Sequence, residues 1–194
     1  MDVKSGDGKA RNGRVILDRE AMEKAILRIA HEIVERSRRL DDVVLLAIPE
    51  GGVALARRIR SRIREINGMD VPLGILDITL YRDDVATTGV TSTMRPSEML
   101  FDVTDKRVIL VDDVLFTGRT TRAALDAIVD FGRPQSIQLA VLIDRGHREL
   151  PIKVDYVGKN IPTSRGDDVH VEFSEEGNAD RVVITVAEGE TCRS

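Results

Sequence analysis

The sequence predicts an α/β protein in which a parallel, doubly wound sheet is flanked by helices. Three strand-like apolar runs lead to this prediction, at residues 43–48, 108–111 and 136–143. Runs rich in valine, isoleucine and leucine are typical of strands that are buried on both faces of a sheet. Helical patterns follow the first two runs after short turns, and strands that alternate with helices favour parallel order.

The chain begins with a polar, glycine-rich stretch, residues 1–13, which we expect to be a disordered lead-in. Residues 14–194 then suit one domain. A short strand is expected at 14–17, and Asp18 is expected to start a helix. Its core-facing residues are Met22, Ile26, Ile29 and Ile33. A second stripe has the composition of a solvated helix face and consists of Arg28, His31, Glu35 and Arg39.

The turn after the run at 43–48 contains Gly51 and Gly52. A glycine pair between a strand and a helix lets backbone amides approach a ligand closely, although an ordinary turn has the same composition. The next helix carries a core stripe of Val53, Ala56, Ile59 and Ile63. Its five arginines indicate either local positive potential or a solvated face: Arg57, Arg58, Arg60, Arg62 and Arg64.

A strand is predicted at 71–80, followed by a polar loop through Pro96. A loop of this length is more often functional than idle, and we expect a flap that closes over a ligand. Farther along, residues 156–163 and 169–173 suggest a small β-rich hood, and 182–186 a final edge strand.

Composition excludes several classes of protein. The 194 residues include 29 basic and 33 acidic ones, so the net charge of -4 does not indicate a general nucleic-acid binder, and any basic surface must be local. One cysteine, Cys192, excludes an internal disulfide framework. No apolar stretch or signal peptide points to a membrane, so we expect a cytoplasmic protein.

Residues 106–134 combine a strand, an acid pair, a hydroxyl-rich turn and a helix with apolar positions at Ala124, Ala127, Ile128 and Phe131. The amides of a helix's first turn bind phosphate readily, with threonine hydroxyls as further donors. Asp112 and Asp113, which end the apolar run, suit ribose hydroxyls or a hydrated Mg²⁺. Together these features predict a sugar-phosphate site at the carboxyl ends of the strands.

The string VILVDDVLFTGRT resembles the signature of the type I phosphoribosyltransferases, which bind 5-phosphoribosyl-1-diphosphate (PRPP). The chain has no P-loop or dinucleotide fingerprint. The resemblance implies the type I phosphoribosyltransferase fold, with Arg82, Asp112 and Asp113 as catalytic residues and Mg²⁺ held at the two aspartates through water or ribose. The substrate positions that it implies are Glu50, Gly51, Gly52, Val114, Leu115, Phe116, Thr117, Gly118, Arg119, Thr120, Thr121, Asp144 and Arg145.

Further strings, among them LDITLYRDD, RIAHEIVER, GRPQSIQLAVLIDRGHRELPI and YVGKNIPTS, resemble the PyrR family of bacterial pyrimidine-operon regulators. This resemblance implies the reaction of uracil with PRPP to give UMP and diphosphate. It also implies UMP-favoured binding to a pyrimidine mRNA leader, on a concave surface that requires at least a dimer. The positions that match the family's RNA contacts are Arg28, His31, Arg36, His147, Arg148, Lys153 and Lys159.

Two positions depart from the family pattern. Glu50 and Gly51 stand where the family often has a threonine and an arginine, and a carboxylate there opposes an anion unless it points away or meets Mg²⁺. Leu27 replaces a polar residue at the RNA face. Two alternatives therefore remain beside the bifunctional regulator and enzyme: an RNA-binding regulator with weak or lost catalysis, and a nucleobase phosphoribosyltransferase of salvage only.

Overall fold

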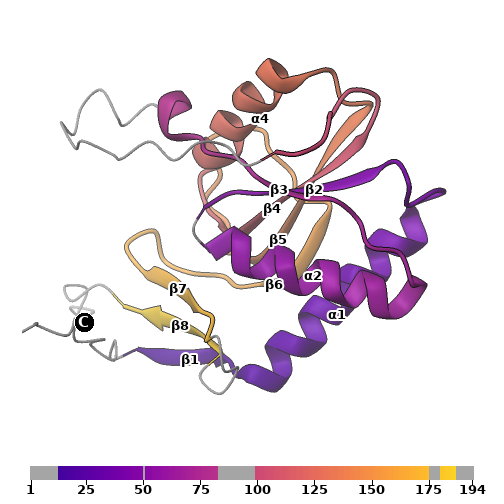
Figure 1. The fold of residues 1–194 in the computed structure, drawn as a ribbon. Coiled ribbons are helices and arrows are strands. Elements are labelled where there is room, and N and C mark those ends of the chain that lie inside the picture. Colours follow the sequence, from indigo (N-terminus) through magenta and orange to yellow (C-terminus); the bar gives the residue numbers. More distant parts are fainter. Residues whose placement is uncertain (1–12, 50, 83–98, 175–179, 187–194) are drawn as a thin grey trace, which may run out of the picture.

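The computed structural model of the chain describes residues 13–49, 51–82, 99–174 and 180–186. The predicted lead-in, except Gly13, lies outside these ranges, as do Glu50 and residues 83–98 of the predicted flap. A five-stranded parallel sheet has the order β3-β2-β4-β5-β6, and a three-stranded antiparallel sheet has the order β1-β8-β7 (Figure 1). The predicted α/β class is thus confirmed.

The parallel sheet consists of β2 (Val43–Ala47), β3 (Leu73–Ile75), β4 (Arg107–Leu115), β5 (Ser136–Asp144) and β6 (Tyr156–Asn160). The small sheet consists of β1 (Arg14–Leu17), β7 (Asp168–Glu172) and β8 (Arg181–Thr185). The helices are α1 (Arg19–Arg36), α2 (Gly51–Asn67) and α4 (Arg119–Phe131), with a short 3₁₀ turn η1 (Thr79–Tyr81). In the described part of the chain, no helix has the length and apolar character needed to cross a bilayer.

Helices α1 and α2 cover one face of the parallel sheet, and α4 covers the other (Figure 1). Strand β2 shows why its sequence is a continuous apolar run. Val43, Leu45 and Ala47 pack in the core beneath α1 and α2, whereas Val44 and Leu46 pack in the core beneath α4. Because side chains alternate along a strand, a strand between two cores needs apolar residues at every position.

Helix α1 begins and packs as its sequence predicts. The Asp18 carboxylate accepts a hydrogen bond from the Ala21 amide at 2.9 Å, which satisfies one unpaired donor of the first turn. The four predicted core residues, Met22, Ile26, Ile29 and Ile33, are all fully buried. This stripe holds α1 against the sheet and leaves its polar stripe facing outward.

The strand predicted at 71–80 is much shorter, because β3 ends at Ile75. The Asp77 carboxylate accepts hydrogen bonds from the amide of Thr79 at 2.9 Å and from its hydroxyl at 2.6 Å. Such local bonds compete with strand pairing and turn the backbone into η1. The turn directs the chain toward Arg82, which is exposed.

Three further expectations require correction. Strand β6 was expected in the hood but pairs in parallel with β5 at the edge of the main sheet. Strand β8 was expected at an edge but is the central strand of the small sheet, which explains why Val182, Val183 and Ile184 are all buried. Phe131, assigned to the core stripe of α4, is 42% exposed because it occupies the last turn, beyond the sheet.

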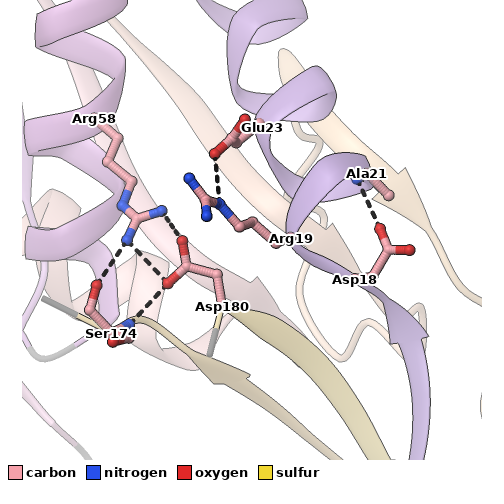
Figure 2. Close-up of polar contacts among 7 residues, drawn as sticks. All are labelled: Asp18, Arg19, Ala21, Glu23, Arg58, Ser174 and Asp180. Atoms are coloured by element: carbon pink, nitrogen blue, oxygen red, sulfur yellow. Dashed lines mark hydrogen bonds and ion pairs between the residues drawn. The ribbon is translucent and has the colours of Figure 1, made fainter. Parts of the chain in front are cut away.

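An ion pair joins the small sheet, which is called the hood from here on, to α2. Asp180, just before β8, has a side chain that is only 1% exposed, and it forms a two-pronged contact with the Arg58 guanidinium, one prong of which measures 3.0 Å (Figure 2). The Ser174 amide donates to the same carboxylate at 2.8 Å, and Arg58 lies over the Phe173 ring. Burial acts to raise the pKa of Asp180, but the bonds from Arg58 and Ser174 lower it overall.

Substitution of Arg58 by alanine should therefore destabilise the fold by about 3 kcal/mol, because it leaves a buried carboxylate without its counter-charge. Urea unfolding measures the loss. Arg57→Ala, which removes an exposed arginine from the next position of α2, should change stability little. Equal stability of the two variants would show that the pair does not hold the hood.

Candidate functional site

Strand β4 carries the acid pair inside the sheet rather than after it. The strand continues through Asp112 and Asp113 to Leu115, and Asp112 is paired in register with Val141 of β5. Asp112 follows the row of Leu110 toward the core beneath α4, and Asp113 follows the row of Val111 toward α2. The expectation that the strand ends at the acids was wrong, because β4 keeps its pairing with β5 beyond them, as far as Leu115 with Asp144.

Both carboxylates accept hydrogen bonds from the next amides of the same strand. The Asp113 amide donates to Asp112 Oδ1 at 3.0 Å, and the Val114 amide donates to Asp113 Oδ1 at 2.8 Å. Each carboxylate thus has one oxygen bound and an orientation fixed by its own backbone.

The glycine pair forms the first turn of α2 rather than a loop before it. An ideal Cβ at Gly51 would lie 1.9 Å from Asp113 Oδ2, and one at Gly52 would lie 2.5 Å from the Val111 carbonyl oxygen. A side chain at Gly52 would therefore clash with the backbone of β4, whereas one at Gly51 would require the Asp113 side chain to move. The predicted diphosphate segment and the acid pair thus lie side by side.

Burial disfavours the ionised form of both acids. Burial raises the pKa of Asp112 well above its ordinary value, the neighbouring Asp113 charge raises it further, and the positive charge of Arg82 acts in the opposite direction. Burial also raises the pKa of Asp113, although the hydrogen bond from the Val114 amide and the charge of His170 act to lower it. A ligand that brings positive charge or hydroxyl donors would favour the ionised pair.

The described residues contain no group of three or more histidines, cysteines or acids that could hold a metal ion. The hard carboxylate oxygens of Asp112 and Asp113 nevertheless fit Mg²⁺, which usually keeps several waters and binds through one or two carboxylates plus substrate phosphates. A metal that arrives with a phosphorylated ligand is compatible with this pair.

The hydroxyl-rich turn joins β4 to α4. Gly118 has φ 91° and precedes the helix, a left-handed conformation that glycine adopts without strain. The Thr117 carbonyl accepts from the Glu149 amide at 3.0 Å, which fixes the turn to the loop after β5. Within the described residues, the buried Thr121 hydroxyl has no hydrogen-bond partner. The amides of residues 119–121 thus form the first turn of α4, the position at which the sequence predicts an anion-binding turn.

The charged side chains expected near the nucleobase are engaged within the protein. Arg145 is 6% exposed, donates to the carbonyls of Ser164 at 3.1 Å and Asp167 at 2.5 Å, and lies 4.0 Å from the centre of the Phe116 ring. Asp144 pairs with Arg148 at 2.5 Å. The Phe116 ring and the backbone of this turn are left as the groups that could contact a base. Arg119, in turn, pairs with Glu149 at 2.8 Å.

The predicted RNA residues form two groups along β6. Arg36 and Arg28 of α1 donate to carbonyls at the edge of the sheet: Arg36 to Asp155 at 2.9 Å, and Arg28 to Val157 and Gly158. Lys159 donates to the Ile16 carbonyl at 3.2 Å. The arginine bonds thus satisfy carbonyls in and just before the edge strand β6, whereas Lys159 links β6 to β1 of the small sheet.

The second group lies in the loop after β5. His147 contacts the Thr163 carbonyl through Nε2 at 2.6 Å, and Arg148 donates to the Phe116 carbonyl at 2.8 Å. His31 and Lys153 are exposed and form no hydrogen bond or ion pair with the described residues. Of the first group, Lys159 lies nearest this loop, because it pairs with Ile143 of β5 one residue before Asp144 pairs with Asn160.

His170 of the hood is a site residue that the sequence did not reveal. It pairs with Asp168 at 2.7 Å, and its charge, when the ring is protonated, lowers the pKa of Asp113 against burial. The alternation at 169–173 predicted a strand but gave no sign of where that strand lies. Only the small sheet brings this strand near the acid pair.

Comparison with known proteins shows the family to which the chain is similar. The model of the phosphoribosyl transferase domain matches residues 14–176. The bifunctional protein PyrR of Pelotomaculum thermopropionicum is 55% identical over 175 residues, which is 90% of this chain and 97% of that protein. The bifunctional protein PyrR of Bacillus velezensis is 53% identical, over 88% of this chain and 95% of the relative.

Solved structures share the fold at low sequence identity. A hypoxanthine phosphoribosyltransferase from Staphylococcus aureus has a TM-score of 0.67 at 19% identity and covers 90% of this chain and 93% of its own. The hypoxanthine phosphoribosyltransferase of Trypanosoma cruzi has a TM-score of 0.65 at 18% identity and covers 90% and 97%. These likenesses confirm the predicted type I phosphoribosyltransferase fold.

The raised pKa of Asp112 leads to a prediction about stability. The unfolded chain loses this proton near pH 3.8, whereas the folded protein loses it only at higher pH, so folding is weakened as pH rises through that interval. Asp112→Asn should therefore be more stable than the parent at neutral pH, by at least about 1 kcal/mol. Denaturant unfolding between acid and neutral pH measures the difference.

The advantage of the Asp112→Asn variant should shrink as the pH falls toward 3.8. Asp126→Asn, at a half-exposed acid of α4, supplies the matched control. A variant that is less stable than the parent at neutral pH would contradict the stated cause of the shift.

Proposed function

Because the chain belongs to the phosphoribosyltransferase family and, within it, to the bifunctional PyrR proteins, we propose that it converts uracil and PRPP to UMP and diphosphate. We also propose that it regulates pyrimidine genes by UMP-responsive binding to an mRNA leader. One observation carries the proposal: the acid pair lies between the glycine start of α2 and the anion-binding turn before α4. We propose further that it acts in the cytoplasm, with a second copy of the chain completing the RNA surface.

The proposed reaction is a displacement at the anomeric carbon. A bond forms from uracil N1 to C1′ of the ribose, the C1′–oxygen bond to diphosphate breaks, and the N1 proton leaves to solvent. The oxocarbenium-like transition state requires a positioned nucleophile and a stabilised leaving group rather than a covalent intermediate. When bound, Mg²⁺ neutralises charge on the diphosphate, and Asp112 and Asp113 would hold it through water or the ribose hydroxyls.

The 5′-phosphate is assigned to the turn at 117–121, where the amides of the first turn of α4 and the hydroxyls of Thr117 and Thr120 supply donors. Because Arg119 is paired with Glu149, its amide rather than its guanidinium is assigned to the phosphate. Arg82 is assigned to the diphosphate, since its charge already reaches Asp112 across the site. Phe116 is assigned to the uracil ring.

A regulator with weak catalysis remains the second candidate. Gly51 lacks the side chain that the family often has in this loop, and the Asp113 carboxylate occupies the space where its Cβ would lie. The enzyme would then bind UMP through the same acid pair and phosphate turn while it stabilises the leaving group less well. Nucleotide binding without rapid turnover would favour this candidate.

For RNA, we propose that the exposed His31 and Lys153 supply contacts, together with Arg28, Arg36 and Lys159 at the edge of β6. The arginine bonds to edge carbonyls leave further guanidinium donors for phosphate oxygens, since each guanidinium has five. Arg148 is less suited to a test of this surface, because it also holds Phe116 and Asp144 of the substrate site.

Substitution of Asp113 by asparagine should reduce the rate of UMP formation at least about tenfold, because it removes the charge that accepts ribose hydroxyls. Conversion of radiolabelled uracil in the presence of PRPP and Mg²⁺ measures the rate, and circular dichroism checks the fold. Asp126→Asn should keep the parental rate. Unchanged kinetics of Asp113→Asn would remove the acid from the mechanism.

Replacement of His31 by alanine should weaken binding of an RNA hairpin about fivefold, or about 1 kcal/mol, through the loss of one contact. Filter retention with UMP present measures the affinity. Asn67→Ala, at an exposed residue on α2, serves as the comparison, and both variants should form UMP at the parental rate. If both variants bind RNA equally well, the α1 stripe is not part of the RNA surface.

A further inference from the structure

We propose that a basic cavity at the amino edge of the parallel sheet binds a backbone phosphate of the RNA, an inference that rests on the RNA binding proposed above. The cavity measures about 480 Å³ and is formed by the loop between α1 and β2 together with the starts of β4 and β5. Its lining residues are Arg38, Arg39, Asp42, Arg107, Gln135 and Ser136.

The cavity is separate from the substrate site. Arg107 and Ser136 are the first residues of β4 and β5 and are paired in register. Asp113 lies six residues farther along β4, about 20 Å away at the usual rise of a strand. The acid pair and the phosphate turn lie at the carboxyl edge of the sheet, so a ligand in this cavity does not compete with PRPP.

The lining is positively charged in a chain whose net charge is -4. It contains three guanidinium groups and one carboxylate, that of Asp42. This carboxylate forms ion pairs with Arg39 at 4.0 Å and with Lys106 at 3.9 Å. Arg39 in addition pairs with Asp41 at 3.2 Å. Arg38 is exposed and forms no hydrogen bond or ion pair with the described residues, so its guanidinium is available to an anion.

The cavity is also rigidly built. The Arg107 guanidinium donates to the Arg39 carbonyl at 2.9 Å, and its amide donates to the Asp42 carbonyl at 2.7 Å. Lys106 donates to the Asp41 carbonyl at 3.3 Å. These bonds fix the loop to β4 and hold the Arg107 side chain in place before a ligand arrives. Guanidinium groups bind phosphate through paired N–H donors, which makes a phosphate ester the fitting ligand.

The cavity continues the proposed RNA surface. Arg36, an RNA candidate, is in the last turn of α1, and its guanidinium lies 5.1 Å from the centre of the Tyr156 ring. The Tyr156 hydroxyl donates to the Gln138 side chain at 3.1 Å, and Gln138 lies two residues beyond Ser136 of the cavity on β5. A row of cations thus runs from the edge of β6 to the cavity.

RNA fits this cavity better than a free nucleotide does. No aromatic ring lines it, so it offers no surface on which a base could stack. A backbone phosphate needs no such surface, because bases and sugars of the same strand are held elsewhere on the protein. The contact should add affinity without sequence preference and should depend on salt.

Arg38→Ala removes the exposed guanidinium and no bond that supports the fold. We expect it to weaken binding of a fluorescein-labelled RNA hairpin about fivefold and to reduce the slope of log affinity against log salt by about one. Fluorescence anisotropy over a range of salt concentrations measures both. Arg57→Ala, at another exposed arginine, should retain the parental affinity and slope, and calorimetric titration should give the same UMP affinity for all three proteins.

The two proposals fail in different ways. If the parent protein does not bind the hairpin, the RNA half of the proposed function is wrong, and this inference with it. If the parent binds and Arg38→Ala matches Arg57→Ala, only the cavity is excluded. If Arg38→Ala leaves RNA binding intact but abolishes a second, weaker UMP site in the calorimetry, the phosphate belongs to a free nucleotide and the RNA assignment is overturned.

Discussion

The backbone of α2 approaches β4 so closely at Gly51 that an ideal Cβ there would overlap the Asp113 carboxylate. This contact determines much of the site. It brings the first turn of one helix beside the acid pair, while β4 itself leads through Gly118 into α4. Two helix starts and two carboxylates thereby meet at one edge of the sheet, where a ligand with phosphates at one end and hydroxyls in the middle finds donors and acceptors in the matching order.

The hood completes this edge from the side. The pair of Arg58 with the buried Asp180 attaches the small sheet to α2 (Figure 2), and the sheet carries His170 toward Asp113. A buried carboxylate is stable only when it is paired, so the Arg58–Asp180 ion pair favours one placement of the hood over others. Burial raises the pKa of both acids of the pair, so their ionisation costs free energy in the folded protein. A bound sugar and cation would reduce that cost, and such competition between function and stability is common.

The arginines of this acidic chain are mostly engaged, and the pattern of engagement separates structural from available charge. On α2, Arg58, Arg60 and Arg62 pair with acids, so the positive potential considered for this helix is largely neutralised. On α1, Arg28 and Arg36 bond to backbone carbonyls and share a single acid, Glu32, at 3.8 and 3.6 Å. Two guanidinium groups therefore face one carboxylate there, whereas Arg38, just beyond α1, has no acidic partner among the described residues.

The sequence by itself determined the parallel sheet, the start and buried stripe of α1, and the order of strand, turn and helix around the acid pair, because these depend on periodicity and on neighbours in the chain. It also pointed to the family through local strings. It did not determine that β6 joins the main sheet, that β8 is central in the hood, or that Asp77 ends β3 early. Nor did it indicate that carbonyls hold Arg145 and Arg148, or that β7 of the hood lies beside β4. Those outcomes depend on which distant segments meet, and a short alternating segment carries the same local pattern whichever strand it pairs with.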